Sequence, residues 1–307
     1  MKSSAQRWRA RLIDPALLAQ LERELPASTL WSVLLGVVAQ RAQQAPAAVL
    51  RQWQQNRFVA PASVEQRALL EIDAELLAAA AGFAALELSP LAPLGACSSV
   101  ALTSQDRVVS STRGTEVVAD PTNLLALESA VRLRRQPGAT VKLATSHRCV
   151  RAQELPKLPG YAAHFRMFCL TTAGKQTADQ SFLVDSVREH IDVHLHALDR
   201  LTQRGYGCEE RRVRIFASPA CAPLARRIAA ELPHLRVVHE PLTQAYYAGL
   251  RFMIDVRTPH GDLVPLIDGG AFDWLERLAA NRKLVFVASA LGSQLVAALF
   301  RRRAPSP

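Results

Sequence analysis

The chain has 307 residues, of which 49% are hydrophobic, so it can bury the core of one large domain or two small ones. Its 37 Lys and Arg residues exceed its 27 Asp and Glu residues, and the resulting net charge of +10 favours nucleic acid, nucleotide phosphates or acidic partners over cationic ones. The basic residues are dispersed, with the densest runs at 132–135, 211–214 and 301–303, which excludes a long basic arm.

The first 80 residues are predicted to form a helical N-terminal segment, because they are rich in Ala, Leu, Gln and Arg and contain helix start signals. Three helices are expected: one from Asp14 to Pro26, one from Ser28 to about Ala45, and one that begins with a capping box at Ser63.

From about residue 81 the pattern changes to short apolar runs separated by Pro, Gly, Ser and Thr, which is typical of strands and turns. Asp120 caps a helix over 121–135. The segments 140–153 and 164–172 then predict two antiparallel strands joined by a long Pro/Gly loop.

The remaining segments predict a helix over about 176–204, a β-α-β unit over 211–240, and a hairpin that turns at 258–262. A buried strand from 283 and a terminal helix follow. Strands joined mostly by hairpins predict an α+β fold, with a mainly antiparallel sheet flanked by helices in a core of residues 81–307.

The five cysteines form no Cys-x-x-Cys pair, which argues against a disulfide framework and a zinc knot and indicates a reducing, cytoplasmic location. Cys149 and Cys169 are expected on neighbouring strands as core residues. The N-terminus has no signal-peptide pattern, and the apolar run at 30–39 is too short to cross a bilayer, so no membrane partner is expected.

Three stretches resemble, in order, the catalytic core of class II aminoacyl-tRNA synthetases, and most of all the branch of histidyl-tRNA synthetase and the ATP phosphoribosyltransferase regulatory subunit. In the first hairpin, "RCVRAQ" resembles the family's Arg-x-Glu strand and "FRMF" its Arg-x-Phe strand. Next, "AYYAGLRF" and "GGAFDWL" resemble Asp-Tyr-Tyr-Thr-Gly and Gly-Gly-Arg-Tyr-Asp-x-Leu. Finally, "VFVASALGSQLVAAL" resembles the last strand and the helix that begins Gly-Leu-Glu-Arg-Leu. The resemblance covers roughly residues 83 to 300.

The resemblance implies a site for a nucleotide and an amino acid, with ATP and Mg²⁺ as cofactors and a homodimer that meets near 86–95. Arg151 would be the catalytic residue, because a strand holds its charge firmly beside the α-phosphate. The residues implied in nucleotide binding are Arg151, Gln153, Arg166, Phe168 and Gln294. Those implied in the amino-acid pocket are Tyr246, Tyr247, Gly269 and Gly270. The glycines would let the backbone approach a ligand, and alternation along a strand would place one tyrosine in the pocket and the other in the core.

Two further clusters have a functional and a structural interpretation. The run 110–116 contains Arg113 and Glu116 around a glycine, and it is either a pocket wall or an ordinary turn. His190 and His194 lie four residues apart on a predicted helix, as metal ligands can, but no third ligand follows at a typical spacing. We therefore predict a solvated helix edge and no metal site.

Several charged positions of the family are neutral in this chain. Gln294 stands where the family has the arginine that binds the γ-phosphate, Gln153 replaces a carboxylate, and Ala271 and Phe272 replace Arg and Tyr. A neutral amide cannot supply the missing charge. The chain also ends seven residues after Phe300, so we expect no anticodon-binding domain.

Three functions therefore remain open, and the sequence does not decide whether the protein is an enzyme. The first is a degenerate paralogue that binds a small ligand, an amino acid or a nucleotide, and acts in regulation. The second is an ATP-dependent ligase that activates an amino acid for a non-tRNA or minimal acceptor. The third is an RNA-binding protein, suggested by the net charge of +10.

Overall fold

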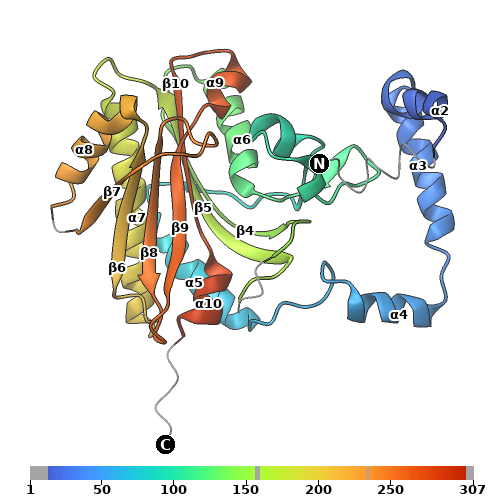
Figure 1. The fold of residues 1–307 in the computed structure, drawn as a ribbon, viewed down its shortest axis with the longest axis horizontal. Helices are drawn as coiled ribbons and strands as arrows, with labels where there is room; N and C mark the ends of the chain where they lie inside the picture. The colour runs from blue at the N-terminus through green and yellow to red at the C-terminus, as the bar shows by residue number, and fades with distance from the viewer. Residues whose placement is uncertain (1–12, 156–159, 234, 302–307) are drawn as a thin grey trace, which may run out of the picture.

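The computed structural model describes residues 13–155, 160–233 and 235–301, and its centre is an eight-stranded sheet (Figure 1). In sheet order the strands are β1 (Ala84–Ala85), β4 (Val141–Val150), β5 (His164–Lys175), β10 (Leu284–Leu291), β9 (Leu263–Phe272), β8 (Leu250–Arg257), β6 (Arg211–Ala217) and β7 (Val237–Pro241). Only the outer pairs β1–β4 and β6–β7 are parallel. The predicted α+β class with a mainly antiparallel sheet is therefore confirmed.

Both predicted hairpins are present. Strand β4 pairs with β5, and β8 pairs with β9, each in antiparallel register. Part of the long loop of the first hairpin, residues 156–159, lies outside the described residues, as do residues 302 and 303 of the last basic run.

Helices cover both faces of the sheet. One face is covered by α5 (Gln66–Ala79), α7 (Ser181–Gln203), α8 (Ala222–Ala230) and α10 (Ser293–Leu299). The other is covered by α6 (Pro121–Arg135) and α9 (Trp274–Ala279), beside a small sheet of β2 (Leu91–Pro93) and β3 (Thr115–Val117). Because side chains alternate along a strand, the two faces have separate apolar cores. In β5, Phe168 packs into the core beneath α7, and its neighbour Met167 packs toward α6.

The helical N-terminal segment divides into two parts. Helix α5 belongs to the core, because Ile72 and Leu76 are fully buried against α7. Helices α2 (Pro15–Ala19), α3 (Ala27–Arg41) and α4 (Pro46–Gln55) bury no residue and extend away from the sheet (Figure 1). Helix α4 was not among the predicted helices, and α5 is capped by the Glu65 side chain in place of the Ser63 capping box.

The two histidines of α7 are not on a solvated helix edge, so that prediction is wrong. His190 and His194 are fully buried and share the Ser289 hydroxyl of β10, each with a nitrogen 2.8 Å from Oγ. The second nitrogen of His190 lies 3.0 Å from the Thr172 hydroxyl of β5. Buried polar groups need such partners, and the two hydroxyls satisfy both nitrogens of His190 and Nε2 of His194, whereas His194 Nδ1 has no hydrogen-bond partner among the described residues.

The predicted core positions of Cys149 and Cys169 are confirmed. The five cysteines form no disulfide with one another, and Cys149 and Cys169 are buried on the paired strands β4 and β5. Within the described ranges, no helix is long and apolar enough to cross a membrane, and no group of three or more His, Cys, Asp or Glu side chains could hold a metal ion.

Candidate functional site

A cavity of about 680 Å³ opens on the face of the sheet that carries α6. Its floor is formed by β5, β9 and β10, and its walls by the start of α6, the residues after β4, and the loop that precedes β8. The cavity contains Arg151, Gln153, Tyr246, Tyr247, Gly269 and Gln294 among the residues implied by the resemblance, and Arg166 borders it.

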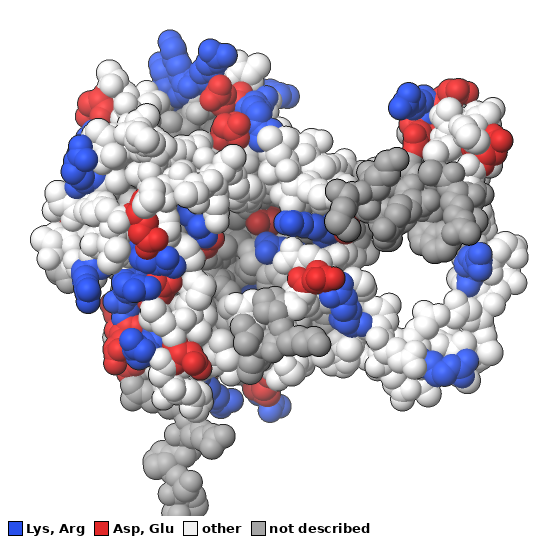
Figure 2. Space-filling model, viewed as in Figure 1, with Lys and Arg blue, Asp and Glu red and all other residues white. Residues whose placement is uncertain are grey.

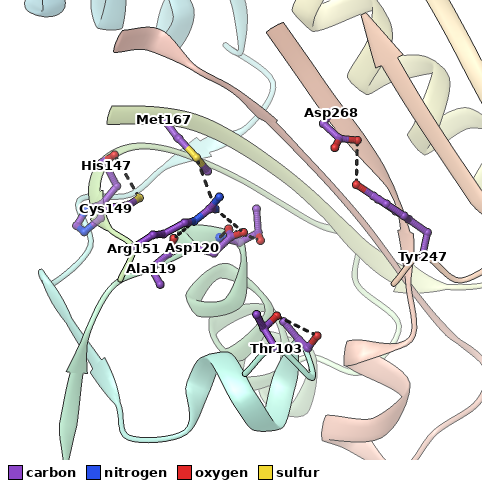
Figure 3. A network of polar contacts seen from close by, with 11 residues as sticks. Thr103, Ala119, Asp120, His147, Cys149, Arg151, Met167, Tyr247 and Asp268 are labelled. Atoms are coloured by element: carbon purple, nitrogen blue, oxygen red, sulfur yellow. Dashed lines mark hydrogen bonds and ion pairs between the residues drawn. The ribbon is translucent and has the colours of Figure 1, made fainter. Parts of the chain in front are cut away.

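Arg151 is held firmly on one wall of the cavity. It follows β4 directly, and its backbone N–H donates to Ala163 O at 2.8 Å, which extends the pairing with the strand opposite. Its Nε donates to Ala119 O at 2.8 Å, and its Nη2 lies 3.2 Å from Asp120 Oδ2 (Figure 3). The guanidinium also lies over the Phe165 ring, 5.1 Å from its centroid. The charge of Arg151 is therefore already paired.

Asp120 joins this arginine to the start of α6. As the N-cap of that helix, its Oδ1 accepts from Thr122 N at 3.0 Å and from Thr122 Oγ1 at 2.6 Å, while Oδ2 pairs with Arg151. Such a cap satisfies a helix N–H that has no partner within the helix. The sequence identified Asp120 only as a cap, because nothing local indicated that its second oxygen reaches Arg151.

The residues of β5 that face the cavity differ from those that the resemblance implies. Phe168 is fully buried beneath α7, and the Arg166 guanidinium forms a 2.5 Å ion pair with Asp73 of α5, on the opposite face of the sheet. Phe165 and Met167 line the cavity instead. Successive residues of a strand point to opposite faces of the sheet, so a shift of one residue along the strand reverses which side chains face the cavity. Arg166 and Phe168 are therefore not arranged as nucleotide contacts in the cavity.

The opposite wall of the cavity is aromatic. Tyr246 and Tyr247 precede β8 in a turn, so both line the cavity, and the expected split between pocket and core is wrong. Tyr246 contacts Phe272 and Trp274 with ring centroids 5.3 and 5.9 Å apart. This wall supplies apolar contact area for a ligand.

A charged group sits within the aromatic wall. The Tyr247 hydroxyl donates to Asp268 Oδ1 at 2.9 Å (Figure 3), and Arg251 binds both oxygens of the same carboxylate at 2.9 and 2.8 Å. Burial and the adjacent Asp268 raise the pKa of Tyr247, so it remains a neutral donor. Asp268 is 41% exposed at the side chain and lines the cavity. The signal that could have identified it is a carboxylate inside the otherwise apolar run "PLIDGG".

The two glycines of β9 make room for the protein's own atoms. A Cβ on Gly269 would lie 2.4 Å from Ser289 Cβ and 2.8 Å from the Phe252 ring. One on Gly270 would lie 2.4 Å from Leu250 O and 2.8 Å from the Tyr247 ring. Both residues lie inside β9, and only Gly269 borders the cavity. The close approaches that need glycine are thus packing contacts of the sheet.

The polar residues of the run 110–116 do not line the cavity. Arg113 is exposed, and Glu116, in β3, is buried. The Glu116 carboxylate accepts hydrogen bonds from Gly95 N and Cys97 N at 2.8 and 2.9 Å, and from Gln105 Nε2 at 2.8 Å. Its role in this structure is to hold two loops together.

Replacement of Glu116 is therefore expected to affect stability more than binding. Glu116→Ala leaves the buried N–H of Cys97 and the part-buried N–H of Gly95 without acceptors, and should lower the free energy of unfolding by about 2 kcal/mol. Arg113→Ala, on the exposed side of the same turn, is the matched control and should change it by less than about 0.5 kcal/mol. Urea denaturation of both variants measures the difference, and equal stability would contradict this role for Glu116.

The comparisons with known proteins concern the fold. No family model matches the sequence, and no curated protein matches it. Solved structures do match: histidyl-tRNA synthetase from S. aureus has a TM-score of 0.55 at 12% identity, over 75% of this chain and 64% of that one. The chain thus spans less than two thirds of that synthetase.

Two further matches cover more of the other protein. An ATP phosphoribosyltransferase regulatory subunit/histidyl-tRNA synthetase from Bacillus halodurans has a TM-score of 0.57 at 15% identity, over 78% of this chain and 81% of that one. A histidine–tRNA ligase subunit from Alicyclobacillus acidocaldarius has a TM-score of 0.54 at 13% identity, over 78% and 97%. Identities this low show the fold alone. The chain therefore has a class II synthetase-like core.

Proposed function

We propose that this protein is a synthetase-like paralogue that binds a small amino acid-like ligand in its cavity and acts in regulation, without activating the ligand. The observation that carries the proposal is the pairing of charge in the cavity. Arg151 pairs with Asp120 and Asp268 pairs with Arg251, and this cation and this carboxylate both line the cavity beside an aromatic wall. Such a surface offers one partner for each end of a zwitterion.

The ligand's orientation follows from these groups. Its ammonium group would pair with Asp268, which is partly exposed, and its carboxylate would pair with Arg151 or with the exposed Arg107 at the rim. The side chain would lie against Tyr246 and Phe272.

A magnesium triphosphate fits these residues less well. Stabilising the growing negative charge of phosphoryl chemistry takes several cations free to engage the ligand. Of the three arginines among the described lining residues, Arg151 and Arg166 are ion-paired, and Arg107 is exposed. Two carboxylates, Asp120 and Asp268, border the same space. Gln294, at the start of α10, is neutral and 2% exposed. No catalytic step is therefore assigned to Arg151.

Calorimetric titration with the twenty amino acids tests this proposal. We expect at least one to bind in the absence of ATP, and Asp268→Asn to weaken that binding at least about tenfold, because the ammonium group loses its charged partner. Glu128→Gln is the control, since it removes the same negative charge from a part-buried side chain of α6 outside the cavity. No binding by any amino acid would contradict the proposal.

The ligase remains the second candidate, and the presence of Arg151 among the lining residues of the cavity supports it. A ligase would exchange pyrophosphate into ATP only when its amino acid is present. The variant Arg151→Ala would abolish this exchange. We expect no exchange. Exchange above background, lost in Arg151→Ala, would replace the regulatory proposal with the ligase.

Neither RNA binding nor dimerisation has a specific observation in its favour. On the face seen in Figure 2, basic and acidic side chains are interleaved and form no continuous basic patch. Binding through phosphate contacts would weaken steeply as salt increases. The homodimer near 86–95 remains an expectation of the resemblance, which sedimentation analysis can test.

A further inference from the structure

A second hollow, of about 360 Å³, lies on the opposite face of the sheet from the aromatic wall, between α5 and the ends of β4 and β5. We call it the Arg148 groove. One side is apolar, with Val64, Leu69 and Leu70. The other side is polar, with Arg148, His164, Arg166 and Asp73. The ligand proposed for the main cavity contacts none of these residues.

One of the two arginines in the groove is neutralised. The Arg166 Nε lies 2.5 Å from Asp73 Oδ2, and the Ser146 hydroxyl donates to Asp73 Oδ1. Asp73 is 5% exposed, so this ion pair is well shielded from water. The carboxylate of Asp73 is thus committed to Arg166 and Ser146.

The second arginine is held by neutral groups. Arg148 Nη1 donates to His164 Nδ1 at 3.0 Å and to Gln294 Oε1 at 3.3 Å. His164 Nε2 lies 2.6 Å from Ala60 O, which can only accept, so the ring proton is on Nε2 and Nδ1 is the acceptor for Arg148. Among the described residues, no carboxylate lies within ion-pair distance of Arg148. Its guanidinium therefore retains a full charge beside a second cation.

The half-buried position makes this charge costly. Burial and the neighbouring Arg166 lower the pKa of Arg148, and Cys149 and Asp73 offset this only in part, although an arginine remains protonated. A buried charge is normally paired, because desolvation without a counterion is unfavourable. A small anion in the groove would supply the missing partner, and Leu69 and Leu70 would contact an apolar part of the same molecule.

We propose that the Arg148 groove binds an oxyanion, either a phosphate or the carboxylate of a small apolar acid, with Arg148 as its ion-pair partner. Arginine suits this role because its planar fork binds two oxygens at once. Arg166 borders both hollows, but the two proposed ligand contacts differ, since Arg148 lines only the groove on the α5 face and Asp268 lines only the main cavity.

The test is calorimetric titration of the full chain with inorganic phosphate and, separately, with hexanoate, at constant low ionic strength. We expect saturable binding of at least one anion, weakened at least tenfold in Arg148→Gln and unchanged in Arg132→Gln, which removes the same charge elsewhere. Tighter binding of phosphate would assign a phosphate ligand, and tighter binding of hexanoate would assign an apolar carboxylate. No binding of either anion, or equal weakening by both variants, would overturn the proposal.

Two further variants keep the test independent of folding and of the main cavity. Leu70 is 57% exposed at the edge of the groove, so Leu70→Asp adds a repelling charge without disturbing the core, and it should weaken anion binding at least tenfold. Asp268→Asn, in the main cavity, should leave anion binding unchanged. If Leu70→Asp binds the anions as tightly as the original chain, the groove is not their site.

Discussion

Acidification from pH 7 to pH 5 is expected to lower the free energy of unfolding by about 4 kcal/mol through His190 and His194, about 2 kcal/mol for each. Burial lowers the pKa of His190 well below its usual value and that of His194 to about 3. In the unfolded chain both imidazoles take up a proton near pH 6.5. The folded state therefore binds fewer protons below pH 6.5, and the stability present above that pH is lost as the pH falls toward 3.

Urea denaturation at several pH values measures this loss. The double variant His190→Gln/His194→Gln should lose most of the dependence between pH 7 and 5, although its stability at pH 7 will be lower because the hydrogen bonds to Ser289 change. His196→Gln, on the exposed side of α7, should keep the dependence because both buried rings remain. An original chain whose stability is flat across this range would show that the two imidazoles are not buried in neutral form.

Gly269→Ala is expected to destabilise the protein by about 3 kcal/mol or more. Gly269 pairs with Ser289 on one side and with Phe252 on the other, and a methyl group would approach both closer than van der Waals contact allows. Overpacking in a rigid core forces neighbours out of their rotamers or shifts the backbone. Movement of Ser289 would also disturb its hydrogen bonds to His190 and His194.

Gly82→Ala is the matched control, because a Cβ at Gly82 would meet no atom within 4 Å. Both variants are compared by urea denaturation, with the change in midpoint and slope recorded. We expect Gly82→Ala to stay within about 0.5 kcal/mol of the original chain. If Gly269→Ala is as stable as Gly82→Ala, a methyl group fits at position 269. The glycine would then be better explained by a ligand that approaches its backbone.

The fold could be predicted from the sequence because its signals are local. The Pro/Gly loops between apolar runs indicated the hairpins β4–β5 and β8–β9, and the Asp120-Pro121 pair indicated the start of α6. The short helix α4 was missed, although Pro46 starts it and Val49, Leu50 and Trp53 recur at helical spacing.

The site was less predictable because it depends on contacts between distant segments. Arg151 lines the cavity, but its pairing with Asp120 depends on how β4 meets α6, over a separation that no local pattern reveals. Arg166 and Phe168 are implied in nucleotide binding only because "FRMF" resembles a family motif. Both point to the face of the sheet that carries α5 and α7, one residue out of step with the cavity. The histidines of α7 were misread because only the folded sheet places Ser289 beside them.

The central claim is that the cavity binds an amino acid without ATP, and thermal unfolding of the full chain tests it most directly. An amino acid that binds only the folded state raises the melting temperature. We expect one amino acid to raise it alone, by the same amount with or without ATP and Mg²⁺, and we expect Asp268→Asn to reduce the rise. A rise that appears only when ATP and Mg²⁺ are present would contradict the account and indicate an activating enzyme.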